Sequence, residues 1–184
     1  MENKDKLTLL NLARESIQSK FEGKNLEINT QKISDALKQK RGTFVTLKIN
    51  DQLRGCIGHI APVQELYQDV IENACAAAFY DSRFMPLAKD ELEKIDIEIS
   101  VLSESKKFEY KSLDLLIQDL EKNKPGVILK KDNQMATFLP QVWEELPNAE
   151  EFLSHLCRKA GLPPYVWKKE VTIETYTIEK ISPD

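Results

Sequence analysis

Two strand-like segments joined by a short turn place the strongest constraint on how this chain can fold. Residues 43–49 are rich in β-branched and aromatic side chains, and residues 53–60 follow as a second apolar run. Asn50, Asp51 and Gln52 lie between them, and residues of these types favour turns. The pattern predicts a β-hairpin, and the two strands of a hairpin are antiparallel.

The return strand of this hairpin combines an arginine, a cysteine, two glycines and a histidine, which points to a site. It reads Leu53-Arg54-Gly55-Cys56-Ile57-Gly58-His59-Ile60. Because side chains alternate along a strand, Arg54 and Cys56 are expected on one face with Gly58, and His59 on the other. Glycine weakens a strand unless a bulge or a close backbone approach is needed. Gly55 and Gly58 therefore predict a cleared surface where another molecule approaches Cys56.

Helical and strand-like patterns alternate along the rest of the chain. Helices are predicted within residues 6–22, 30–40, 62–78, 88–93, 112–120 and 148–160, and further strands within residues 95–102, 127–129, 135–140 and 171–178. Residues 141–147 are expected to form a linking segment. These elements predict an α+β fold, with a mostly antiparallel sheet and flanking helices, in a single domain spanning residues 1–184.

Residues 95–102 alternate between apolar and polar side chains with unusual regularity. Their isoleucines are expected to face a core, while Asp96, Glu98 and Ser100 face the other way. Two interpretations of the polar face remain open: it contacts solvent, or it lines the surroundings of Cys56. In the second case Glu98 is a candidate acid/base. The segment with Asp81 and Arg83 also has two interpretations. It is a capped turn with an Asp81–Arg83 pair, or it forms the rim of a site that contains the Cys56 thiol.

Composition narrows the classes of function. The net charge is −4 and acidic residues are interspersed among the lysines, so no nucleic-acid partner is expected. No apolar run reaches the ~20 residues that cross a bilayer. The first residues are charged and resemble no secretory signal, which makes the cytoplasm the expected location.

The cysteines and histidines do not form a recognisable cofactor site in the sequence. Cys56, Cys75 and Cys157 are far apart, as are the two histidines, His59 and His155. A structural zinc site is therefore not expected, and reduced thiols are the simplest interpretation. The chain has no phosphate-binding loop or dinucleotide fingerprint, so no cofactor is expected.

Residues 53–58 resemble the hallmark Leu-Arg-Gly-Cys-Ile-Gly of the AMMECR domain family, also called AmmeMemoRadiSam system protein A. The resemblance covers the chain from about residue 7 onward. It includes Asn73-Ala74, Asp81 with Arg83-Phe84 and Pro86, Glu91-Leu92, and residues 97–102, 139–142 and 152–162. One departure is residues 133–137, where the family usually has glycines.

The resemblance implies an α+β fold of two unequal lobes, with the cysteine motif at the groove between them. It also implies a radical-SAM protein and a Memo-like protein as partners, and it assigns no reaction. A small anionic ligand is the other expected partner. The candidate binding residues are Arg54, Gly55, Gly58, His59, Asn73, Asp81 and Arg83.

Two hypotheses follow for Cys56. In the first, Cys56 is the nucleophile of an enzyme or an acceptor subunit, with Arg54 at roughly 7 Å on the same face favouring the thiolate and holding an anionic group. Glu98, Asp81 or Arg83 would position or protonate that group. In the second, residues 54–58 dock a partner or a small anion, and Cys56 packs against residues 74–78. The second needs no general base and is preferred, because a Cys56–His59 pair would require a bulge at Gly58.

Overall fold

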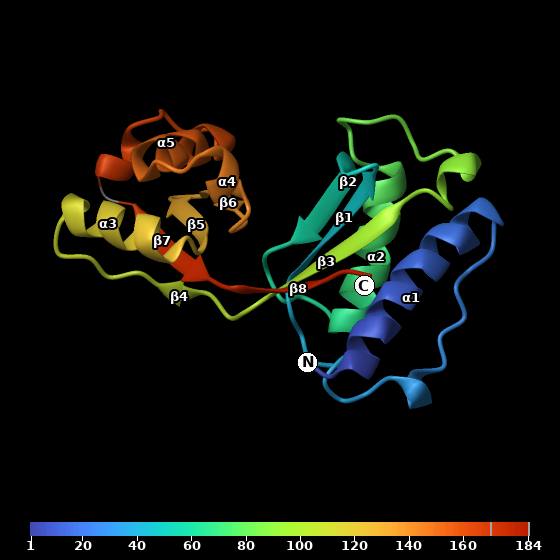
Figure 1. Ribbon diagram of the computed structural model, residues 1–184. Helices are drawn as coiled ribbons and strands as arrows, with labels where there is room; N and C mark the ends of the chain where they lie inside the picture. The colour runs from blue at the N-terminus through green and yellow to red at the C-terminus, as the bar shows by residue number, and fades with distance from the viewer. Residues whose placement is uncertain (170, 184) are drawn as a thin grey trace. The chain divides into compact units, whose positions relative to one another are not determined.

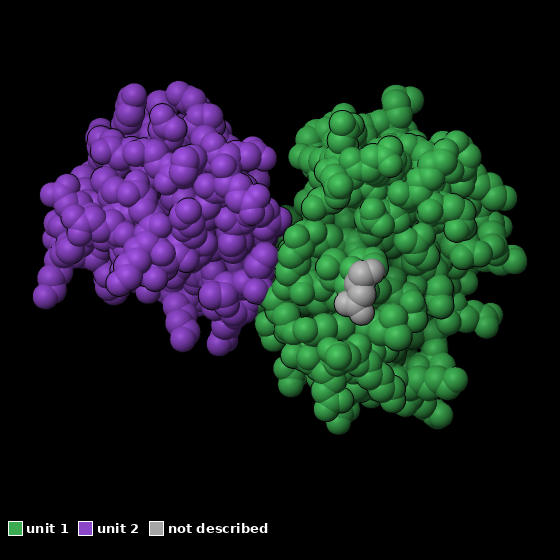
Figure 2. All heavy atoms as spheres, in the orientation of Figure 1, with its two compact units in different colours: residues 1–102, 179–184 green, residues 103–178 purple. Residues whose placement is uncertain are grey.

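The computed structural model describes residues 1–169 and 171–183 and divides into two compact units. Unit 1 comprises Met1–Leu102 and Glu179–Asp184, and unit 2 comprises Ser103–Ile178 (Figure 2). Each unit has a four-stranded sheet with its own helices (Figure 1). The predicted α+β fold is confirmed, with two sheets.

The sheet of unit 1 has the strand order β2-β1-β3-β8. β1 (Thr43–Ile49) pairs antiparallel with both β2 (Gln52–His59) and β3 (Asp96–Leu102), and β8 (Ile178–Ile181) is the last strand in this order. The predicted hairpin is therefore confirmed. Asn50 and Asp51 at its turn have φ angles of 52° and 63°. Positive φ at both positions is what a tight hairpin turn with the native strand twist requires.

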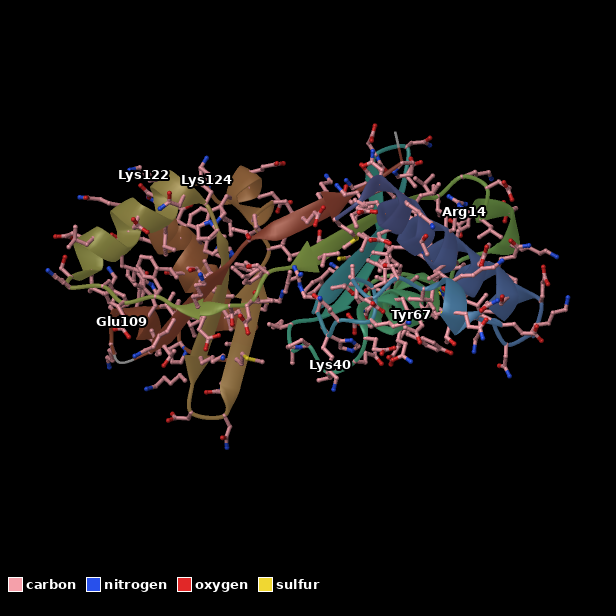
Figure 3. The ribbon with its side chains drawn as sticks, turned by 90° about the horizontal axis from the view of Figure 1, so that it is seen from below. Arg14, Lys40, Tyr67, Glu109, Lys122 and Lys124 are labelled. Carbon is pink, nitrogen blue, oxygen red and sulfur yellow. The ribbon has the colours of Figure 1, made fainter. Side chains whose placement is uncertain are left out.

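Two helices cover one face of this sheet (Figure 1). α2 (Leu66–Phe79) packs on β1 and β2, while α1 (Asn3–Phe21) packs on α2 and β3. Arg14 of α1, labelled in Figure 3, donates from its guanidinium to the carbonyl oxygens of Leu92 and Ile95 at 2.9 and 2.8 Å. The buried core includes Leu9, Ile17, Val45, Leu47, Val70, Ala74, Ile97, Ile99 and Val101.

Three of the predicted helices are shorter than their sequence patterns suggest. Residues 30–40 contain only the 3₁₀ turn η1 (Thr30–Lys32), because Ile33 already has extended geometry (ψ 122°). The helix predicted from Pro62 begins only after Glu65, and Val63 is 62% exposed. The segment predicted for residues 88–93 is the 3₁₀ turn η2 (Lys89–Glu91).

The late start of α2 has a tertiary cause. The amide of Leu66 donates to the carbonyl oxygen of Gln39, and that of Tyr67 donates to Leu37. An isolated β-bridge between Lys40 and Glu65 continues this contact. These bonds hold the chain in extended geometry up to Glu65, so the first helical turn cannot form earlier.

The sheet of unit 2 has the strand order β4-β7-β5-β6. Its strands are β4 (Lys106–Lys107), β5 (Gly126–Lys131), β6 (Gln134–Phe138) and β7 (Thr172–Tyr176). Its helices are α3 (Leu113–Asn123), α4 (Val142–Glu145), α5 (Ala149–Lys159) and the 3₁₀ turn η3 (Val166–Lys168). The β5–β6 hairpin confirms a prediction, whereas β4, β8 and α4 were not predicted.

The helix ends of unit 2 follow the sequence signals closely. The Ser112 hydroxyl accepts a hydrogen bond from the amide of Leu115, and the Asn148 side chain accepts one from Glu151. Lys124 ends α3 and has a φ of 44°. Figure 3 labels Lys124 and its neighbour Lys122 at this end of the helix. Cys157 on α5 is fully buried, as predicted.

The two ends of unit 2 are tied to each other. The amide of Ser103 donates to the carbonyl oxygen of Thr177 at 2.8 Å, and the amide of Thr177 donates to the Ser103 hydroxyl at 3.0 Å. Unit 2 is therefore inserted between β3 and β8 of unit 1. Among the described residues, no helix has the length and apolar character needed to cross a membrane.

Candidate functional site

Cys56 lies on the face of the unit 1 sheet that points away from α2. The register places Cys56 opposite Thr46 of β1, and Thr46 opposite Glu98 of β3. The Thr46 hydroxyl donates to Cys56 Sγ at 3.3 Å. Glu98, with a side chain only 12% exposed, pairs with Lys48 at 3.2 Å and Lys180 at 2.7 Å. Glu98 of β3 therefore lies in one cross-strand row with Thr46 and Cys56, and its acid/base role stays a prediction.

Asp81 binds the edge of β2 at Cys56. Its Oδ2 accepts the Cys56 amide at 2.9 Å. Arg83 donates from Nε to Asp81 Oδ1 at 2.9 Å and from Nη2 to Oδ2 at 2.7 Å, and Nη2 also donates to the Cys56 carbonyl oxygen at 3.2 Å. The Arg83 guanidinium, helped by the Cys56 and Arg83 amides and opposed by burial, lowers the pKa of Asp81 to about 2. An ionised carboxylate and a guanidinium therefore together satisfy the outer backbone groups of Cys56.

Arg83 is a cation that contacts Cys56 through the backbone carbonyl oxygen. Its hydrogen bonds to Asp81 raise the pKa of Arg83, and the electrostatic interaction with Cys56 contributes in the same direction. The Arg83 side chain is 54% exposed, so the guanidinium is also accessible from solvent.

Arg54, in contrast, binds a carboxylate of its own chain. Its Nε and Nη2 donate to the two Glu91 carboxylate oxygens at 2.8 Å each, and Nη1 donates to the Met85 carbonyl oxygen at 3.0 Å. The Arg54 side chain is 17% exposed. Arg54, together with the Ala88 amide, lowers the pKa of Glu91 to about 2. The role of Arg54 in ligand binding stays a prediction, but its guanidinium already has an anionic partner.

The two glycines beside Cys56 serve packing. A Cβ atom on Gly55 would lie 2.1 Å from the Ala77 carbonyl oxygen of α2, and one on Gly58 would lie 2.3 Å from the Thr43 carbonyl oxygen and 2.4 Å from the Phe44 ring. The glycines therefore allow close approach within unit 1. The expectation that Cys56 packs against residues 74–78 is wrong, because Gly55 occupies that contact and Cys56 points the other way.

His59 and Asn73 belong to a separate polar cluster on the α2 side of the sheet. His59 Nδ1 lies 2.7 Å from Asp69 Oδ1, and Asn73 Nδ2 donates to Asp69 Oδ2 at 2.9 Å. The Thr43 hydroxyl also donates to Asp69 Oδ2, at 2.6 Å. The Asp69 side chain is 1% exposed, so these donors compensate a buried carboxylate. The structure therefore brings Cys56, Glu98, Asp81 and Arg83 into one region and places His59 and Asn73 elsewhere.

Thr46, Asp69 and Glu91 also belong to these clusters, although they were not predicted from the sequence. Asp69 carried a usable signal, because it lies one helical turn before Asn73 on the otherwise apolar side of α2. Thr46 carried a weaker signal, because it is a polar residue at an outward-facing position of a strand. Glu91 lies 37 residues after Arg54, and no local pattern links the two.

The other thiols and the metal-binding residue types add no second site. Burial raises the pKa of both the Cys75 and the Cys157 thiol. Within residues 1–169 and 171–183, no three His, Cys, Asp or Glu side chains gather in a group that could hold a metal ion.

The family model AMMECR1 matches residues 10–181 of the chain. The chain belongs to the AMMECR1 family. The family resemblance inferred from residues 53–58 is therefore confirmed.

Relatives and a solved structure agree with this assignment to the AMMECR1 family. Protein NEQ441 of Nanoarchaeum equitans is 38% identical over 175 residues, which cover 94% of this chain and 96% of the relative. Protein MK0488 of Methanopyrus kandleri is 40% identical over 168 residues, covering 86% and 78%. The crystal structure of uncharacterized protein PH0010 from Pyrococcus horikoshii matches with a TM-score of 0.88 and 31% identity, covering 98% of this chain and 92% of that one.

Proposed function

We propose that this AMMECR1-family protein is a binding protein that acts together with a radical-SAM protein and a Memo-like protein. In this proposal the face of β2 that carries Cys56 recognises an anionic group of the partner. The observation that carries the proposal is the position of Asp81, which binds the Cys56 amide and the Arg83 guanidinium at once. A half-exposed cation is thereby held against the backbone of Cys56.

Preorganisation supports a role in recognition. Sites held in place by their own hydrogen bonds lose little side-chain freedom when a ligand binds. Arg83 is restrained by three hydrogen bonds to Asp81 and Cys56 from Nε and Nη2, while its Nη1 makes no hydrogen bond recorded among the described residues. Lys48 and Lys180 each form an ion pair with Glu98, so two further cations lie near this row. An anionic group is the ligand chemistry that fits these cations.

Affinity capture from the native cell tests the proposal. We expect wild-type protein to retain a radical-SAM protein and a Memo-like protein, both identified by mass spectrometry. Arg83→Gln should lower the recovery of both at least 10-fold, because the cation is lost, and Cys56→Ala should retain both. Lys20→Gln is the matched control, since it removes an exposed charge elsewhere in unit 1. Equal recovery with Arg83→Gln, in a variant whose circular dichroism is unchanged, would contradict the proposal.

A second candidate function is covalent chemistry at Cys56. It is favoured by the Thr46 hydroxyl, which donates to the sulfur at 3.3 Å, together with the electrostatic interaction between Arg83 and Cys56. Donors of this kind stabilise a thiolate, which is the nucleophilic form of cysteine. Glu98 shares the row and would supply the acid or base.

Iodoacetamide labelling at neutral pH tests the second candidate. Labelling is read peptide by peptide, so that Cys75 and Cys157 act as internal references. We expect Cys56 to react at least 10-fold faster than a free thiol, and Arg83→Gln to slow it by more than threefold. A rate no faster than that of a free thiol would exclude the nucleophile.

A further inference from the structure

The outer edge of β2 is closed at Cys56. β2 is an edge strand, and the Cys56 amide donates to Asp81 and so points away from β1. Cys56 and Thr46 are therefore a non-hydrogen-bonded pair, the arrangement in which facing side chains come closest. The 3.3 Å contact between Thr46 Oγ1 and Cys56 Sγ fits this assignment. Asp81 and Arg83 thus occupy the positions that a neighbouring strand would take.

The same edge is open two residues further along. Because backbone direction alternates along a strand, the N–H and C=O of Gly58 point outward as those of Cys56 do. No hydrogen bond recorded among the described residues uses the N–H or the C=O of Gly58. Gly58 has no side chain, and Phe44 covers it from the sheet face. An unpaired edge of this kind is a template for an added strand.

The neighbouring residues limit how far an added strand can extend. An added strand cannot pair with Cys56, because Asp81 and Arg83 already bind the Cys56 N–H and C=O. Beyond Cys56 the register shifts, with Arg54 as the extra residue of a β-bulge, and bulges interrupt pairing. A segment that pairs with Gly58 must therefore end at Arg83.

We propose that this edge binds the free C-terminal tail of a partner protein, extended and antiparallel to β2, with its terminal carboxylate on Arg83. The antiparallel direction follows from the geometry, because the tail runs from the His59 side and ends beside Cys56. Arg83 is 54% exposed, and its Nη1 hydrogens are directed to no acceptor recorded among the described residues. Guanidinium and carboxylate form strong charge-assisted hydrogen bonds. This inference rests on the proposed function, and it specifies which anionic group the partner supplies.

Two synthetic peptide libraries provide the probe. Random hexapeptides with free C-terminal carboxylates, and the same library with C-terminal amides, are passed over the immobilised full chain. Retained peptides are then read by mass spectrometry. We expect the acid library to be enriched at least 10-fold over the amide library. Arg83→Gln should reduce this difference to less than threefold, while Lys20→Gln leaves it unchanged.

Selective ¹⁵N-glycine labelling locates the binding site. The chain has six glycines, so the amide spectrum is simple. A retained acid peptide should shift the Gly58 signal and slow its hydrogen exchange at least 10-fold, while Gly23 and Gly161 serve as references. Unchanged Gly58 exchange at saturating peptide would overturn the proposal, as would equal retention of the two libraries or no retention. Gly58 protection that rises with protein concentration without peptide would also overturn it, because copies of the chain would then be pairing with each other.

The two proposals fail in different ways. If Arg83→Gln abolishes partner capture and Gly58 remains unaffected, the tail-binding inference is wrong and the proposed function stands. If Arg83→Gln leaves partner capture intact, the proposed function is wrong. The labelled spectrum of Arg83→Gln shows whether that variant is folded.

Discussion

Phe84 lies between two arginine–carboxylate pairs that have different consequences for the protein. The guanidinium carbons of Arg54 and Arg83 are 6.0 and 5.5 Å from the centroid of its ring. Arg54 joins β2 to Glu91 and to the carbonyl oxygens of Met85 and Pro86. Arg83 joins Asp81 to Cys56 and stays half exposed. The anion-binding role was predicted for Arg54, because strand alternation places Arg54 near Cys56 but gives no sign of its partner Glu91.

The Asp81 pair predicts an acid-dependent loss of stability. Because the folded-state pKa of Asp81 is about 2 and an unfolded aspartate has a pKa of about 3.9, the pair stabilises the protein above pH 4. That contribution, about 2 kcal/mol, is lost as the pH falls from 4 to 2. We expect urea unfolding of Asp81→Asn to show a smaller decline over this range than wild type.

Asp35→Asn is the matched control for this measurement. Asp35 has a fully exposed side chain and lies 3.7 Å from Lys38. Its replacement should leave the acid-dependent decline as in wild type. An identical decline in wild type and Asp81→Asn would contradict the assigned role of Asp81.

The Arg54–Glu91 pair predicts a strong energetic coupling. The two side chains share two hydrogen bonds and are 17% and 24% exposed. Arg54→Ala should lower the free energy of unfolding by about 1–3 kcal/mol, since it also leaves Glu91 uncompensated. In a double-mutant cycle with Glu91→Ala we expect a coupling of at least about 1 kcal/mol. Additive effects of the two substitutions would show that the pair is not formed.

At the scale of elements, the contact between α2 and β2 determines which face of the sheet holds Cys56. Gly55 lets the Ala77 backbone approach the strand. This contact covers one face with helix and leaves the thiol on the other, beside Thr46 and in one row with Glu98. The close approach at Gly55 therefore sets the position of the candidate site.

Gly55→Ala tests this contact. The added Cβ would lie 2.1 Å from the Ala77 carbonyl oxygen, so α2 must shift. We expect a loss of about 1–3 kcal/mol, the usual cost of overpacking, measured by urea unfolding followed by circular dichroism. Ala61→Ser, at an exposed position, is the control. An unchanged midpoint for Gly55→Ala would mean that α2 does not lie over this residue.

Local elements were predictable from the sequence, and elements fixed by distant contacts were not. The Asn50–Asp51 turn and the caps at Ser112 and Asn148 depend on neighbouring residues, so composition and spacing revealed them. The start of α2 and the strand β8 depend on partners far along the chain. The same distinction applies to the candidate site. The strand that carries Cys56 was predicted from the sequence. The row that Cys56 forms with Thr46 and Glu98 was not, because it depends on the register between β2, β1 and β3.

At the scale of the whole molecule, the two units have separate hydrophobic cores. Both tryptophans of the chain, Trp143 and Trp167, are buried in the core of unit 2. Trp143 stacks on Phe152 with ring centroids 3.8 Å apart. Tryptophan fluorescence therefore reports on unit 2.

Phe152→Ala should separate the unfolding of the two units. We expect a cost of about 3–5 kcal/mol in the fluorescence transition, because a large fully buried ring is removed. Hydrogen exchange of the β1 and β2 amides should stay near its wild-type rate. Gly55→Ala is the reciprocal control, which should affect exchange in unit 1 and leave the fluorescence midpoint in place. Equal shifts of both probes in both variants would show a single cooperative transition instead.

The insertion of unit 2 between β3 and β8 has a consequence for biosynthesis. A ribosome releases the chain from its N-terminus, so β1, β2 and β3 emerge well before residues 178–181. The nascent chain must then carry β3 without its β8 neighbour while all of unit 2 is translated. Unit 1 therefore completes its sheet only after unit 2 has been translated.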